Sequence, residues 1–141
     1  MIIVSACLLG LCTRHDGDSA YSKEAVKALE GACPLPICPE ELGGLLTPRP
    51  AAEITSGDGS SVILHKARVV DVNKADVTDN FLKGAAEALN IARRAGAVLA
   101  FLKEKSPSCG VSLICRAGGY HSGMGVTAAL LKMKGIKLMG F

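Results

Sequence analysis

The feature that most constrains the fold is a short apolar run that ends in a rigid, cysteine-bearing turn. Residues 97–102 (Ala-Val-Leu-Ala-Phe-Leu) are continuously apolar and lie between a glycine and a charged cluster. Such a run is typical of a parallel strand that is buried on both faces of a sheet. In the turn that follows, residues 105–110, Pro107 fixes φ and Gly110 lacks a Cβ. Backbone amides and the Cys109 thiol can therefore approach a bulky group.

The same layout occurs at two other places in the chain. Residues 1–6 form an apolar run that ends at Cys7, and residues 34–37 form a short extended segment that ends at Cys38. In open α/β sheets, ligands bind in the crevice beyond the carboxyl ends of the strands. We therefore expect these two cysteines to converge there with Cys109, although the three lie far apart in the sequence.

The remaining signals alternate between helix and strand, as expected for an α/β domain. They predict helices over residues 23–30, 79–95 and 126–134, and strands over residues 111–115 and 136–139. Outside the sheet they predict β-like runs at 61–65 and 67–70 and a glycine-rich loop at 118–125. We therefore predict a single three-layer α/β domain over residues 1–141. Its sheet is mainly parallel, helices cover both faces, and the site lies at the carboxyl ends of the strands.

Composition excludes several classes of function. The chain is 49% hydrophobic and 21% charged, which is typical of a globular protein. It has no Trp, two Tyr and three Phe, so a base-stacking platform for nucleic acid is not expected. The apolar N-terminus lacks the basic region and cleavage motif of a signal peptide, and no apolar run is long enough to span a bilayer. We expect a cytoplasmic protein with no membrane or nucleic-acid partner.

Six cysteines in a reducing compartment favour metal binding or catalysis over disulfides. Three interpretations of the cysteines that follow strands remain open from spacing alone. Buried structural thiols are common. A closed zinc site usually uses CxxC pairs, which this chain lacks. An iron–sulfur cluster accepts scattered thiolates, and with three of them one iron stays open for a substrate.

Each polar residue near these cysteines can be interpreted as functional or as structural. Glu40 and Glu41 directly follow Cys38, where either could act as a general acid or base or simply form a solvated first helical turn. Ser106 could hydrogen-bond a ligand or close its own turn. Arg49 could hold an anion or decorate a loop.

Six motifs run in order along almost the whole chain. They are residues 5–10 (SACLLG), 38–40 (CPE), 43–50 (GGLLTPRP), 76–78 (DVT), 105–110 (KSPSCG) and 125–131 (GVTAALL). Together they closely resemble the family catalogued as domain of unknown function 523, whose characterised members are thiouracil desulfidases. The resemblance implies a desulfidase that hydrolytically removes sulfur from a thiolated pyrimidine such as 2-thiouracil and gives uracil and sulfide.

The resemblance also implies a cofactor and roles for individual residues. A [4Fe–4S] cluster would be held by Cys7, Cys38 and Cys109, with its fourth iron open to the sulfur of the substrate. Glu40 would move protons between water and substrate, and Ser106 would orient the base.

Asp16, in the Arg-His-Asp-Gly stretch, is a further polar candidate for the same site. Cys12, Cys33 and Cys115 would be surplus thiols. The partner would be a small thiolated nucleobase. The alternative function is a non-catalytic zinc or iron–sulfur binding domain or sensor, and a thiolated nucleoside is a further possible substrate.

Overall fold

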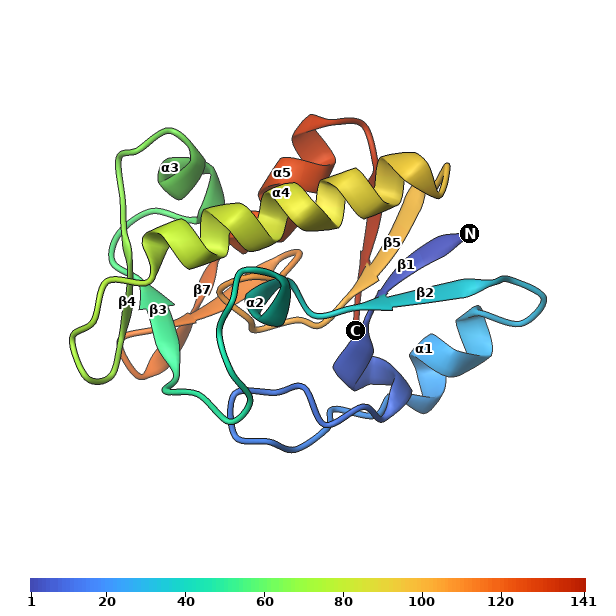
Figure 1. The fold of residues 1–141 in the computed structure, drawn as a ribbon, viewed down its shortest axis with the longest axis horizontal. Helices are drawn as coiled ribbons and strands as arrows, with labels where there is room; N and C mark the ends of the chain where they lie inside the picture. Colours follow the sequence, from blue (N-terminus) through green and yellow to red (C-terminus); the bar gives the residue numbers. More distant parts are fainter.

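A four-stranded parallel sheet forms the centre of the computed structural model, which describes residues 1–141 (Figure 1). Its strands lie in the order β2-β1-β5-β8 and every neighbouring pair is parallel. Their bounds are β1 (Ile2–Ser5), β2 (Pro34–Ile37), β5 (Leu99–Leu102) and β8 (Lys137–Gly140). β1 pairs with both β2 and β5, so the three strands that precede the candidate cysteines are neighbours.

Helices cover both faces of this sheet, which confirms the predicted three-layer α/β class (Figure 1). The helical segments are η1 (Ala6–Leu9), α1 (Lys23–Ala28), α2 (Pro39–Leu42), α3 (Gly59–Ile63), α4 (Thr78–Arg94) and α5 (Val126–Met133). α4 and α5 pack on the face that includes Ile3, and α1 packs with η1 on the face that includes Val4. None of these helices combines the length and the hydropathy that a bilayer-crossing helix needs.

The longest helix, α4, follows from simple periodicity and from its ends. Its buried residues recur at helical spacing: Phe81, Gly84, Ala85, Ala88, Leu89 and Ala92. Asp79 lies in its first turn, and Arg93 and Arg94 lie in its last turn. At these positions each charge interacts favourably with the helix dipole and stabilises the helix. The helix lies across the sheet and over α2, and it packs closely against both.

The segment between α2 and α4 corrects one prediction. β3 (Ala52–Ile54) and β4 (Val69–Asp71) form a two-stranded antiparallel pair, and β4 overlaps the predicted run at 67–70. The β-like run at 61–65 is wrong, because its first residues belong to α3. Asp58 caps this helix by accepting a hydrogen bond from the Ser60 N–H, and the Ser61 hydroxyl accepts from the Asp58 N–H. This capping box outweighs the β propensity of the apolar residues.

The predicted glycine-rich loop at 118–125 is also wrong in part. β6 (Leu113–Arg116) and β7 (Gly119–Ser122) form an antiparallel hairpin, so only the last residues of that stretch lead directly into α5. A Cβ on Gly125 would collide with the backbone of Ser108 and Cys109. The glycine thus lets the start of α5 pack directly on the turn that carries Cys109.

Candidate functional site

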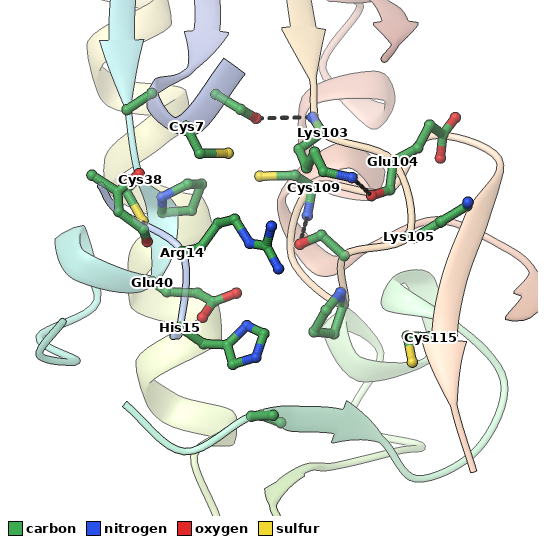
Figure 2. A pocket seen from close by; sticks show the side chains of 18 of the residues that line it. Cys7, Arg14, His15, Cys38, Glu40, Lys103, Glu104, Lys105, Cys109 and Cys115 are labelled. Atoms are coloured by element: carbon green, nitrogen blue, oxygen red, sulfur yellow. Dashed lines mark hydrogen bonds between the residues drawn. The ribbon is translucent and has the colours of Figure 1, made fainter. Parts of the chain in front are cut away.

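A cavity of about 350 Å³ opens at the carboxyl end of the parallel sheet, and Cys7, Cys38 and Cys109 all line it. In Figure 2 the thiols of Cys7 and Cys109 point toward each other across its inner end, and Cys38 lies beside them. The strand order explains this placement, because β1 lies between β2 and β5. The volume is within the range of small-ligand sites.

Cys7 and Cys109 are placed by the ends of adjacent strands. Cys7 lies in η1, the tight turn that follows β1, and is buried. The Ser5 hydroxyl accepts a hydrogen bond of 3.0 Å from the Lys103 N–H, which fixes the end of β1 to the end of β5. Cys109 is also buried, in the turn that β5 leads into.

The Cys109 turn is closed by Ser106 and by the start of α5. The Ser106 hydroxyl oxygen accepts from the Ser108 N–H at 3.2 Å and from the Cys109 N–H at 3.0 Å. The Thr127 N–H donates to the Ser108 carbonyl at 2.9 Å. Because the two amides use both acceptor positions of the Ser106 oxygen, the hydroxyl proton is the remaining polar group that can be directed at a ligand.

Cys38 is the N-cap of α2, as its Cys-Pro sequence predicts. Its thiol lies 3.6 Å from the Thr13 carbonyl oxygen, to which it donates. The Arg49 Nη2 lies 3.8 Å from the same sulfur. The thiol therefore lies between the loop that follows β1 and the segment that follows α2.

Burial raises the pKa of all three thiols. The pKa of Cys109 rises to about 12, and desolvation is also the main cause of the increase for Cys7 and Cys38. Without a metal these groups are therefore neutral thiols at pH 7. Metal ions bind thiolates, so a metal at this site would replace three protons.

The donor set suits a polynuclear group better than one ion. No group of three His, Cys, Asp or Glu side chains converges as the ligands of a single metal ion do. Three thiols nevertheless share one cavity. Thiolates are the ligands of iron–sulfur clusters, and several metal atoms can bridge ligands that do not meet at one point. The residues present thus fit a cluster with three protein ligands.

Glu40 and Arg49 form an ion pair in the wall of the cavity. Arg49 Nε donates to Glu40 Oε2 at 2.6 Å, and the two side chains are only 6% and 15% exposed. Glu40 Oε1 has no protein partner, and the carboxylate points into the cavity (Figure 2). Burial alone would lower the pKa of Arg49, but the charge of Glu40 and its hydrogen bond outweigh burial and raise it.

Three further cationic side chains line the cavity and were missed by the sequence analysis: Arg14, Lys103 and Lys105. Burial lowers the pKa of Lys103, whose Nζ donates to the Glu104 carbonyl at 2.9 Å. The Lys105 Nζ lies 4.7 Å from the centre of the Tyr120 ring. The strand-end rule that selected the cysteines could have found both lysines, because they lie between β5 and Cys109. Their charge favours an anionic group in the cavity.

Asp16 does not line the cavity. It is exposed and forms an ion pair of 3.0 Å with Arg14, whose guanidinium does line it. Of the surplus thiols, Cys12 and Cys33 are exposed and outside the lining. Cys115 does line the cavity, but in Figure 2 it lies apart from the other three cysteines and its sulfur points away from them.

Comparison with known proteins identifies the family. The model of the 2-thiouracil desulfurase family matches residues 2–140 of the chain. The chain belongs to the 2-thiouracil desulfurase family. The resemblance seen in the sequence motifs is thereby confirmed.

Two relatives of this desulfurase-family chain cover nearly all of it. An uncharacterized protein, YbbK of Bacillus subtilis (strain 168), is 41% identical over 142 residues, which span 99% of this chain and 94% of the relative. The solved structure of the [4Fe–4S]-dependent thiouracil desulfidase TudS matches with 42% identity and a TM-score of 0.84. That match covers 99% of this chain and 89% of that chain.

Proposed function

We propose that this chain removes sulfur from a thiolated pyrimidine such as 2-thiouracil, with a [4Fe–4S] cluster held by Cys7, Cys38 and Cys109. The observation that carries the proposal is the shared cavity of these three buried or half-buried thiols next to the Glu40 carboxylate. Membership of the 2-thiouracil desulfurase family supports the reaction, and the [4Fe–4S] dependence of TudS supports the cofactor.

The overall reaction needs water and no electron donor. The C=S bond of the base breaks, a C=O bond forms with the oxygen of water, and sulfur leaves as sulfide. When bound, a cluster with three protein ligands supplies an open iron, a soft Lewis acid that polarises a thiocarbonyl. Lys103 and Arg14 line the cavity in which negative charge would accumulate on the sulfur.

Glu40 is proposed to move the proton. Its Oε2 is held by Arg49, so Oε1 faces the cavity and can accept a proton from the attacking water. The same oxygen can then return the proton to the product. The ion pair with Arg49 fixes the direction of the carboxylate before the reaction begins.

Ser106 and Asp16 are proposed to place the base. The free hydroxyl proton of Ser106 can donate to an acceptor atom of the pyrimidine, since two amides occupy the oxygen. Asp16 acts indirectly, because its ion pair holds Arg14 at the cavity wall. The proposed partner is a small thiolated base. The whole chain, residues 1–141, is proposed to act as one domain.

Glu40→Gln tests the proposal against a non-catalytic binding domain. With protein prepared and reconstituted without oxygen, the variant should retain iron and sulfide but release sulfide from 2-thiouracil about 100-fold more slowly, as general acid–base catalysis implies. Glu41→Gln is the matched control, because Glu41 is exposed and outside the cavity lining. Wild-type protein with a full cluster and no sulfide release from any thiolated pyrimidine would contradict the proposal.

A further inference from the structure

We propose that Arg49 is a positioning residue for the desulfidase reaction, because it holds the proton-transferring carboxylate and one cluster ligand at the same time. This inference rests on the proposed function, in which Glu40 moves the proton and Cys38 binds the cluster. The sequence alone did not assign a role to Arg49. In the structure its guanidinium contacts both Glu40 and Cys38.

The hydrogen bonds of the guanidinium are complete. The Arg49 side chain is buried, and its five N–H groups have five acceptors from three segments of the chain. The acceptors are Glu40 Oε2 at 2.6 Å, Thr47 Oγ1 at 2.8 Å, the Thr13 carbonyl at 2.9 Å, the Leu46 carbonyl at 3.4 Å and Cys38 Sγ at 3.8 Å. Such a planar fork fixes the position of every group that it contacts.

The contact with sulfur matters most when Cys38 is a ligand. As a thiol, Cys38 donates to the Thr13 carbonyl. As a thiolate it has no proton to donate, but it can accept a hydrogen bond from Arg49 Nη2. Hydrogen bonds to the sulfurs are among the features that set the reduction potential of an iron–sulfur cluster. Arg49 is thus placed to stabilise the more negative, reduced form.

The contact with Glu40 decides which oxygen is available for chemistry. Because Nε occupies Oε2, only Oε1 is free at the cavity wall. The Arg49 backbone N–H also donates to the His15 carbonyl at 2.8 Å, which ties this segment to the loop after Cys7. Without the guanidinium, the carboxylate would lose its charge partner and its fixed direction.

Lysine cannot reproduce this arrangement. Its single ammonium carries three donors at one point, so it can keep the charge near Glu40 but cannot also reach Cys38 and Thr13 with a planar fork. Arg49→Lys therefore tests whether the charge alone is sufficient. Arg49→Met removes both the charge and the planar fork and keeps a long side chain.

The test uses full-length, cluster-loaded Arg49→Met and Arg49→Lys beside wild type. Arg68→Met is the matched control, because Arg68 makes a single exposed ion pair with Asp76 outside the cavity. We expect both Arg49 variants to lower kcat for sulfide release from 2-thiouracil by about 10- to 100-fold, with KM little changed. This is the usual effect of removing a residue that hydrogen-bonds to a metal ligand. The midpoint potential of the cluster should become more negative in both, and the control should match wild type.

A double-variant cycle shows through which residue Arg49 acts. In the Glu40→Gln background, Arg49→Met should lower kcat little further, since residues that act as a unit are not additive. The potential should still shift, because that effect runs through Cys38. Full additivity in kcat would overturn the assigned path through Glu40.

The remaining outcomes are also decisive. Wild-type kcat and potential in Arg49→Lys would overturn the proposal, and this variant keeps the test valid if Arg49→Met fails to fold. Wild-type protein that holds a cluster but releases sulfide from no thiolated pyrimidine would contradict the proposed function alone, and the potential shift would then decide the role of Arg49. Wild-type protein that holds no cluster would overturn both.

Discussion

At the scale of single residues, each of the three candidate ligands is held by a different local structure. Cys7 sits in a tight turn, Cys38 caps a helix, and Cys109 lies in a turn whose amides bind the Ser106 hydroxyl. Cys115 shares the cavity but belongs to the β6–β7 hairpin, apart from the other three thiols. We therefore leave Cys115 out of the proposed ligand set.

The first prediction compares two cysteines of the same cavity. Cys109→Ser should reduce the iron content after anaerobic reconstitution to below about one tenth of the wild-type value, because a hydroxyl is a poor ligand for soft metals. Cys115→Ser should keep wild-type iron. Iron and acid-labile sulfide analysis on the two purified variants measures the difference, and equal contents would contradict the proposed ligand set.

At the scale of helices and strands, the crossing of α2 and α4 determines the position of Cys38. A Cβ on Gly84 in α4 would collide with the Pro39 carbonyl in α2, and one on Gly43 would collide with the Asn80 carbonyl. Glycine at both positions lets the two backbones touch. Because Cys38 is the N-cap of α2, this contact sets where its thiol enters the cavity.

The second prediction tests this crossing. Gly84→Ala should lower the free energy of unfolding by about 1–3 kcal/mol, since an extra methyl group in a filled contact forces the helices apart. It should also reduce cluster content through the displaced cap. Gly119→Ala is the control, because a Cβ there meets nothing within 4 Å. Equal thermal unfolding midpoints of the two variants would show that α2 can shift without cost.

How far the sequence predicts the fold depends on the type of signal. Short apolar or extended segments predicted the four central strands, and helical spacing predicted α4. The run at 61–65 failed because the capping interaction of Asp58 is local and polar, whereas the β prediction used only the apolar residues. The β7 strand failed because Gly119 and its neighbours carry no strand pattern and pair only through β6.

The candidate site was predicted where it depends on strand ends and missed where it depends on tertiary contacts. The strand-end rule selected Cys7, Cys38 and Cys109, and the structure places all three at one cavity. The contacts of Arg49 with Thr13, Cys38 and Glu40 join segments that the fold brings together, so no spacing in the sequence could indicate them.

One carboxylate links the site to the acid stability of the whole molecule. Partial burial alone would raise the pKa of Glu104. Hydrogen bonds from the Ser112 hydroxyl and from the N–H groups of Leu113, Ser112 and Val111 outweigh burial and lower it. These bonds close residues 105–113, the segment that carries Cys109, into a loop.

The third prediction follows from the sign of that shift. A carboxyl whose pKa is lower in the folded state contributes stability above its unfolded pKa of about 4.5, and loses it as the pH falls through the folded value. The free energy of unfolding of the wild type, measured with denaturant, should therefore decrease as the pH falls from about 5 to about 3. Glu104→Gln should be less stable at pH 7 and less sensitive to acid. Parallel curves for the two proteins would contradict the assignment.

The fourth prediction concerns the cofactor. A group bound at Cys7, Cys38 and Cys109 joins three chain segments and binds only the folded state, so its removal must lower stability. Anaerobic chelation of iron should lower the thermal midpoint of wild type, and Cys109→Ser should show no such decrease. A midpoint that does not change on loss of iron would contradict three-point attachment.

The order of the strands also determines when during synthesis the site can exist. β1 and β2 leave the ribosome early, yet β5, which completes the pocket beside β1, comes only after α4. A nascent chain that ends before position 109 holds at most two of the proposed ligands. With the proposed ligand set, a cluster can therefore be held by three thiolates only after residue 109 has been synthesised, and fragments that end earlier should not retain iron.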